Sequence, residues 1–314
     1  MASFRFVAVA SLLASVAMIS APAERAEADD MGMGASETSA PAAGDAATLR
    51  ASPGSTWSAI KKDLSSGFFN FSSIKANEAN RGHGSLESYN YLSLEYRLSR
   101  EEKVFFRPAF LFNFGGSDLR DRDVASKFEW SDGYFGYSSY ALPWLPFEMD
   151  YKTELRAYLP TSEISQKNGM ISRLRGDLKG YIPLSTRATF LLWFKPDYFI
   201  QSRTASTNDR GFAQGNKHFG YDLSANYYYN ATRAIGFGAA VGHEQYWTHA
   251  SAAENLDVYR TENLNLSAFV GFSYVGFLTH IGLDQSRNIA RPRDSFELAR
   301  DTETQYFARS YYRF

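Results

Sequence analysis

The chain of 314 residues contains no cysteine, only 10 prolines, and no apolar run after its first 20 residues that approaches the roughly 18 residues of a membrane-spanning helix. Without cysteine, disulfide frameworks, thiolate metal sites and cysteine nucleophiles are excluded. The formal net charge is −1, from 33 basic and 34 acidic residues, so the surplus of positive charge typical of nucleic-acid-binding proteins is missing. We therefore expect no nucleic-acid partner.

The N-terminal segment has the pattern of an export signal. A single positive charge, Arg5, precedes an apolar run from Phe6 to Ile19, which matches the core of a signal peptide and is too short to cross a bilayer. Small residues flank two candidate cleavage sites, after Ala23 and after Ala28. We expect residues 1–28 to be a signal peptide and the mature chain to be exported.

Residues 29–65 are rich in alanine, serine, glycine, threonine and acidic residues, and they show almost no apolar periodicity. Such a composition cannot bury enough apolar surface to offset the entropy of ordering, so we expect a flexible periplasmic leader. A short helix over Ser55–Leu64 is consistent with the spacing of Trp57, Ile60 and Leu64 at i, i+3 and i+7.

From residue 66 onward the dominant pattern is alternation with a period of two. Between Phe147 and Leu159 every second residue is uncharged, and the positions between them carry Glu148, Asp150, Lys152, Glu154 and Arg156. A strand separates these two sets onto opposite faces, whereas a helix would mix them. Comparable alternation recurs at residues 92–98, 103–114, 173–182, 189–201, 221–227, 235–242, 264–271 and 277–284.

The connections between these strands alternate between short turns and long loops, as expected when one rim carries tight turns and the other carries loops. We predict an all-β fold, a transmembrane antiparallel up-and-down β-barrel over residues 66–314 with about 12 strands. The first strand, near Gly67–Lys75, and the strand at Gly133–Ala141 carry aromatic residues on both faces, so counts of 10 or 14 also fit. An even count places both termini at the periplasmic rim.

The last strand ends in Tyr312 and Phe314, two aromatic residues on one face at the C-terminus. With the alternating strands, this ending resembles that of Gram-negative outer-membrane β-barrel proteins, whose C-terminal aromatic signal is read by the barrel-assembly machinery. The resemblance covers residues 66–314 and is to the class, with no motif that selects a family. It implies an outer-membrane location and contact with membrane lipid. Cations of the predicted long loops, among them Arg120, Arg203 and Arg291, are candidates for contact with lipopolysaccharide phosphates, and ordinary solvated loop charge is the alternative.

Parity along the strands predicts the residues that line the lumen. A symmetric hairpin centred on residues 164–165 would place Glu154 opposite Arg175 and Lys152 opposite Asp177, and such pairing predicts weak ion selectivity. The predicted lumen residues are Asp150, Lys152, Glu154, Arg156, Arg173, Arg175, Asp177, Lys179, Lys195, Asp197, Asp222, His280 and Asp284.

Several glycines also point inward by parity, among them Gly220, Gly236, Gly238, Gly242 and Gly282. Two interpretations stand: the residues 55–64 or an inward loop pack against this wall, or the glycines serve strand curvature.

These features favour a porin-like channel for passive diffusion of small polar solutes, without a cofactor or metal. A structural or surface-binding barrel without conductance is the alternative. A rim lipid hydrolase is a further alternative, since His83-Gly84-Ser85 and His249-Ala250-Ser251 lie in predicted outer loops, although no third orienting residue accompanies either triplet.

Overall fold

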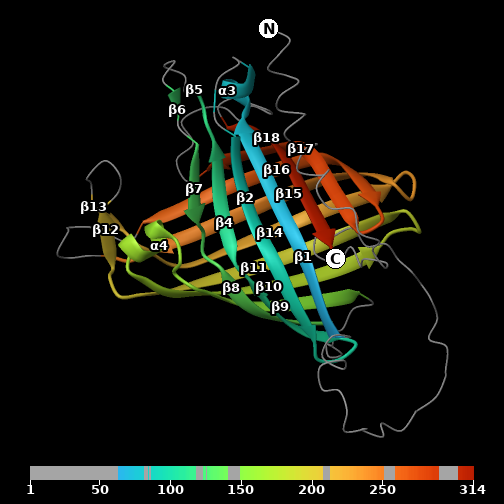
Figure 1. Cartoon of the computed structure of the whole chain (residues 1–314), viewed down its shortest axis with the longest axis horizontal. Helices are drawn as coiled ribbons and strands as arrows, with labels where there is room; N and C mark the ends of the chain where they lie inside the picture. The colour runs from blue at the N-terminus through green and yellow to red at the C-terminus, as the bar shows by residue number, and fades with distance from the viewer. Residues whose placement is uncertain are drawn as a thin grey trace, which may run out of the picture.

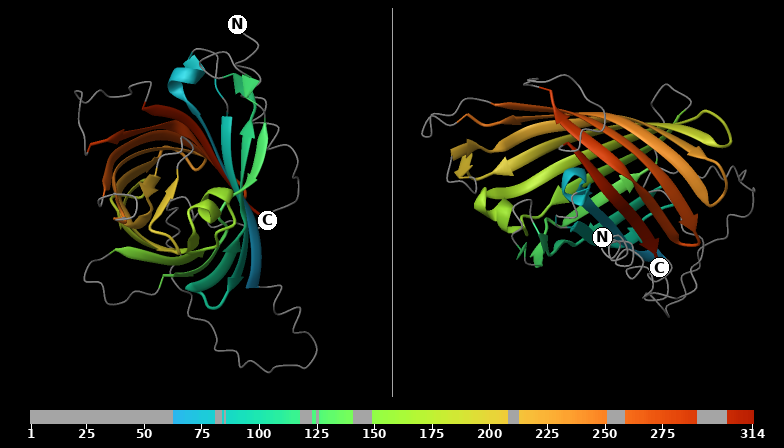
Figure 2. Two further views of the ribbon diagram at one scale, coloured as in Figure 1. Left: turned by 90° about the vertical axis from the view of Figure 1, so that its left-hand side faces the viewer. Right: turned by 90° about the horizontal axis from the view of Figure 1, so that it is seen from above.

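The computed structural model describes residues 63–80, 84, 86–117, 123–124, 126–140, 149–207, 213–250, 259–289 and 303–314. Most of the described strands form one antiparallel sheet that closes on itself, because the first strand pairs with the last strand on one side and with the second strand on the other. Two separate two-stranded sheets complete the described strands. The left view in Figure 2 shows strands curving around the interior. Closure satisfies the backbone donors and acceptors at what would otherwise be sheet edges.

Twelve strands traverse the barrel in the described residues, as predicted. The segments β3 and β4 are two halves of one strand interrupted at Pro108, which has no N–H to donate, and β7 and β8 are the halves of its neighbour. The strands are β1 (Leu64–Lys75), β2 (Leu86–Arg97), β3 (Glu102–Arg107), β4 (Ala109–Phe114), β7 (Lys127–Trp130), β8 (Tyr134–Ser139), β9 (Asp150–Tyr158), β10 (Met170–Pro183), β11 (Ala188–Gln201), β14 (Lys217–Asn230), β15 (Ile235–Thr248), β16 (Arg260–Tyr274), β17 (Phe277–Asn288) and β18 (Thr304–Arg313).

The two ends of the barrel differ. Short turns such as the one at Gly276 lie at the same end as the C-terminus, where the Phe314 amide donates to the Ser66 carbonyl over 3.0 Å. The opposite end carries the small extra elements, of which α4 and the β12–β13 hairpin are visible at the left of Figure 1. These elements are α3 (Ala76–Asn80), β5 (Gly116–Ser117), β6 (Asp123–Val124), α4 (Glu163–Lys167), β12 (Ala205–Thr207) and β13 (Ala213–Gly215). No helix in the described ranges has the length and hydrophobicity to cross a bilayer.

The two faces of the barrel wall follow the predicted alternation. On β9, Leu155 is 64% exposed on the outer face, whereas its neighbour Glu154 is 1% exposed on the inner face. Leu174, Leu178 and Leu223 are likewise exposed on the outside. This arrangement places apolar side chains on the outer face and polar side chains toward the enclosed interior, the pattern typical of outer-membrane barrels.

The structure corrects two strand boundaries. Leu64, predicted to end a helix, is the first residue of β1, which therefore begins three residues before the predicted Gly67. Met149 lies before β9, which begins at Asp150 instead of the predicted Phe147. The predicted signal peptide and nearly all of the predicted leader and helix lie outside the described residues.

A cluster of mostly aromatic side chains, which we call the aromatic cluster, occupies part of the interior. Its four buried members are Leu191, Tyr228, Phe269 and Phe307. Phe71, Tyr181 and Trp193 pack against it. These side chains face inward from strands that lie apart in the sequence, so the barrel has an apolar core on one side of its lumen.

Some of the inward glycines make room for rings, and others for backbone. A Cβ atom added to Gly238 would lie 2.1 Å from the Phe269 ring, whereas one added to Gly282 would lie 2.1 Å from the carbonyl oxygen of Ala268. Gly220 leaves room for the Tyr246 ring in the same way as Gly238 does for Phe269, at 2.0 Å. Rings from adjacent strands therefore take the space at Gly220 and Gly238. Residues 55–62 lie outside the described residues, and both predicted interpretations remain predictions.

This packing predicts that Gly238→Ala destabilises the barrel by about 1–3 kcal/mol, because the new methyl group displaces the buried Phe269 ring. Gly242→Ala on the same strand is the matched control, since its Cβ would meet Ser224 at an ordinary 3.4 Å. Urea unfolding of the refolded barrels in detergent measures the stability of both variants. Equal losses of stability in the two variants would contradict the role assigned to Phe269.

Candidate functional site

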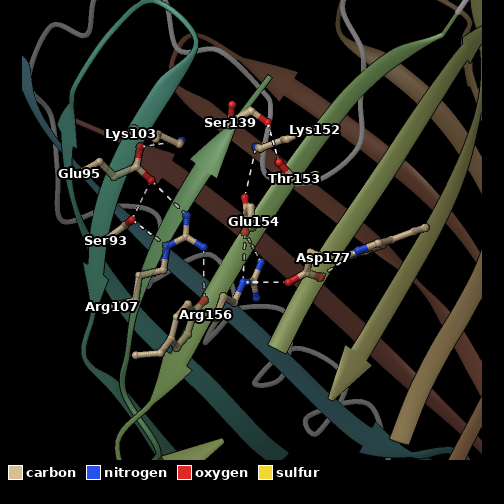
Figure 3. A network of polar contacts seen from close by, with 12 residues as sticks. Ser93, Glu95, Lys103, Arg107, Ser139, Lys152, Thr153, Glu154, Arg156 and Asp177 are labelled. Atoms are coloured by element: carbon tan, nitrogen blue, oxygen red, sulfur yellow. Dashed lines mark hydrogen bonds and ion pairs between the residues drawn. The ribbon is translucent and has the colours of Figure 1, made fainter. Parts of the chain in front are cut away.

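The candidate site is the barrel interior, and its charged wall begins at Glu95 on β2. Glu95 accepts hydrogen bonds from the Ser93 hydroxyl at 2.9 Å, from Lys103 Nζ at 2.9 Å and from Arg107 Nη2 at 3.1 Å (Figure 3). Arg107 also donates to the Tyr134 hydroxyl at 3.3 Å. Glu95 and Arg107 are both almost completely buried, so each needs the other to offset its desolvation.

A second cluster surrounds Glu154 and Asp177 on β9 and β10. Arg156 bridges the two carboxylates, with its Nε 3.1 Å from Glu154 Oε2 and 3.0 Å from Asp177 Oδ2 (Figure 3). Lys152 Nζ lies 3.4 Å from the other oxygen of Glu154, and Trp193 Nε1 donates to Asp177 at 2.9 Å. Both carboxylates are therefore neutralised from several sides.

A third cluster is centred on Asp197 of β11. Arg173 forms a bidentate pair with it, at 2.8 and 2.7 Å, and the Tyr246 hydroxyl donates to the same carboxylate at 3.1 Å. Lys195 on the same strand pairs with Asp222 of β14. Bidentate geometry fixes the guanidinium plane, so Arg173 is held in one orientation.

The register of the β9–β10 hairpin differs from the predicted one by two residues. Position numbers of opposed residues sum to 331 instead of 329, so Arg173 faces Tyr158, not Arg156. The loop explains the shift, because it contains the helix α4, capped by the Ser162 side chain and followed by Gly169 at φ +67°. The shift places like charges directly opposite one another, Arg156 with Arg175, Glu154 with Asp177, and Lys152 with Lys179.

A shift of two leaves every side chain on its predicted face but changes the pairing. Ion pairs run along a strand, as between Lys152 and Glu154, or diagonally, as between Arg156 and Asp177. The predicted cross-strand ladder of Glu154 with Arg175 and Lys152 with Asp177 is therefore wrong. The argument for weak ion selectivity rested on that ladder.

An interior cavity of about 710 Å³ lies between the charged wall and the aromatic cluster. A second space of about 640 Å³, which we call the vestibule, lies toward the long-loop end and is lined by Ser165, Asn168 and Lys217 among others. Asp132 and Arg173 line both spaces. Arg173 therefore stands where a solute would pass between the vestibule and the interior cavity.

The predicted lumen residues fall into three groups. Asp150 lies exposed at the start of β9. Lys152, Glu154, Asp177, Asp197 and His280 are buried within the wall. The residues that line the interior cavity are Arg156, Arg173, Arg175, Lys179, Lys195, Asp222 and Asp284.

His280 belongs to the aromatic side of the interior. Its ring stacks on Phe269 at a centroid distance of 4.3 Å, and Arg309 Nη2 donates to its Nδ1 at 2.9 Å. Arg309 also lines the interior cavity, as does Arg107, and neither was among the predicted lumen residues. Parity places both on the inner face, so the alternation could have revealed them.

The long-loop rim does not assemble a catalytic triplet in the described residues. The ring of His249 lies against that of His218, with centroids 4.7 Å apart and the planes tilted by 35°. Partial burial together with the neighbouring His218 lowers the pKa of His249. Ser251 and the pair His83 and Ser85 lie outside the described residues. Among the residues described, no three histidine, aspartate or glutamate side chains converge as metal ligands.

The predicted assembly signal lies at the end of β18. Phe314 is 50% exposed, and its ring meets that of Tyr312 edge to face at 5.0 Å. The two rings lie at the rim with short turns.

Comparison with solved structures places the chain among outer-membrane β-barrels. The COG4313 outer membrane channel from Pseudomonas putida F1 shares the fold, with a TM-score of 0.52, 10% identity, and coverage of 80% of this chain and 95% of that one. LpxR from Salmonella typhimurium covers 79% of this chain and 99% of its own, at 9% identity and a TM-score of 0.38. No family model and no curated protein matches the chain. The fold is therefore that of an outer-membrane barrel.

We predict that breaking the second charged cluster causes a large loss of stability. Glu154→Gln leaves Lys152 and Arg156 with one fewer counter-charge in a buried position, and we expect a loss of roughly 3 kcal/mol in unfolding free energy. The matched control is Glu163→Gln, because Glu163 forms an exposed pair with Lys167, which lowers the pKa of Glu163.

Urea unfolding of both variants in detergent provides the measurement. The Glu163 variant is expected to keep the wild-type midpoint, because exposed pairs contribute little. A Glu154 variant as stable as the wild type would show that the cluster does not require this carboxylate.

Proposed function

We propose that the protein is an outer-membrane channel through which small polar solutes diffuse passively. The observation that carries the proposal is the pair of spaces inside a closed barrel, an interior cavity of about 710 Å³ and a vestibule of about 640 Å³, with Arg173 and Asp132 shared between them. A barrel of 12 strands lies between the filled barrels of eight strands and the open pores of 16 or more.

The proposed route of a solute follows from the residues that line the vestibule and the interior cavity. Solutes enter by the long loops, pass Arg173, and cross a cavity whose fixed charges replace part of their hydration. Movement needs no energy source, because the route depends only on a concentration gradient. The proposed orientation has the short turns and both termini in the periplasm, with loop cations near lipopolysaccharide and Tyr312 and Phe314 read by the barrel-assembly machinery.

A structural or surface-binding barrel without conductance is the second candidate. The aromatic cluster favours it, because Leu191, Tyr228, Phe269 and Phe307 occupy part of the lumen. A rim lipid hydrolase would require Ser85 or Ser251, so lipase activity that is lost in Ser85→Ala or Ser251→Ala would replace the channel proposal.

The channel proposal predicts discrete conductance steps when the purified chain is added to a planar bilayer. Arg173→Ala is expected to raise the single-channel conductance, because it removes the side chain between vestibule and cavity. Lys167→Ala, on the exposed face of α4, is the matched control and is expected to leave the conductance unchanged. A wild-type protein that is folded but never conducts would favour the non-conducting barrel.

A further inference from the structure

The interior cavity is lined by two chemically different kinds of side chain. The rings include Phe71, Trp193 and Phe269, and the cations include Arg156 and Arg175. Few single solute groups complement both kinds. A ligand that fills the space must present an apolar face to the rings and charge to the cations.

The charge on the cavity surface is predominantly positive. Seven basic side chains line it against three acidic ones, Asp132, Asp222 and Asp284. The four carboxylates at the centres of the ion-pair clusters, Glu95, Glu154, Asp177 and Asp197, are at most 4% exposed and do not line the cavity. Arg107 and Lys179 are as buried as these carboxylates, at 1% exposed. The other five bases still outnumber the three acids that line the cavity, which favours anions.

Two guanidinium groups that line the cavity are incompletely paired. Arg175 Nε lies 3.7 Å from Asp177 Oδ2, and neither of these buried atoms has a hydrogen-bond partner in the described structure. Arg309 Nε is also buried without a partner. Arg173, by contrast, forms a bidentate pair with Asp197, so the charges of Arg175 and Arg309 are offset less completely.

Cations and rings of the lining are already in contact with one another. The ammonium groups of Lys179 and Lys195 lie 4.4 and 4.1 Å from the centre of the Trp193 ring, and the Arg309 guanidinium lies 5.7 Å from that of Phe269. A bound molecule with a ring and an anionic group would contact both kinds of group at once.

We propose that the interior cavity binds small aromatic carboxylates, with the carboxylate toward Arg175 and Arg156 and the ring toward Phe269 and Trp193. This inference rests on the channel proposed above and names its substrate class. A neutral aromatic compound leaves the guanidinium donors unused, an aliphatic anion leaves the rings uncovered, and an aromatic cation meets the surplus of positive charge. The class therefore follows from the wall as a whole.

The test measures block of the potassium chloride current through the full-length mature chain in planar bilayers. Benzoate is compared with acetate, benzyl alcohol and benzylammonium. We expect benzoate to reduce the current at about a tenfold lower concentration than each of the others, a preference of about 1.4 kcal/mol. Equal block by acetate or by benzyl alcohol would overturn the proposal, and so would stronger block by benzylammonium.

Variants test separately whether the cations and the rings of the lining cause the benzoate preference. Arg175→Gln and Phe269→Leu are each expected to abolish the benzoate preference, whereas Arg175→Lys keeps the charge and is expected to retain part of it. Lys167→Gln is the control with unchanged preference. Retention of the full preference in both Arg175→Gln and Phe269→Leu, with folding verified by heat-modifiable mobility in gels, would overturn the assignment.

Binding is also measured without conductance, by the benzoate-dependent quenching of tryptophan fluorescence that disappears in Trp193→Phe. Quenching in a barrel that never conducts would overturn the channel and support the binding site. Conductance without selective quenching or block would support the channel and overturn the binding site.

Discussion

The energetic cost of enclosing ionised side chains in a narrow barrel governs the interior of this protein. Twelve strands leave too little space for each charge to keep its own hydration shell, so a charged group is stable only where opposite charge or a hydrogen-bond partner reaches it. The carboxylates of Glu95, Glu154 and Asp197 meet this requirement with two or more donors each. The three clusters are the consequence.

Rings fill part of the remaining interior, because a charged side chain without a partner is too costly to enclose there. The Phe269 ring extends from β16 over the neighbouring strand β15 at the position where Gly238 has no side chain. Glycine in a strand normally weakens it, since nothing packs above the backbone. A ring from the adjacent strand restores that packing, so small and large residues on neighbouring strands function as one unit.

Alternation along the sequence predicts which face each residue occupies, and the faces of β9 and β10 agree with it. Alternation does not predict register, because a shift of two residues exchanges every cross-strand partner and leaves every face unchanged. In the β9–β10 hairpin the outcome depends on how many residues the loop uses, and the helix α4 takes up five of them. The same limit hid the filling of Gly238, because the identity of the ring above it depends on register.

The observed register also determines the sign of the surface that a solute meets. In a ladder with opposite charges face to face, each carboxylate would neutralise one base at the lumen surface. Instead Arg156 faces Arg175 across the strands, and Glu154 faces Asp177. Arg156 reaches diagonally to Asp177, and Arg175, which lines the cavity, is left 3.7 Å from the same carboxylate without a hydrogen bond from its Nε. Pairing that satisfies the buried acids thereby leaves positive charge facing the lumen.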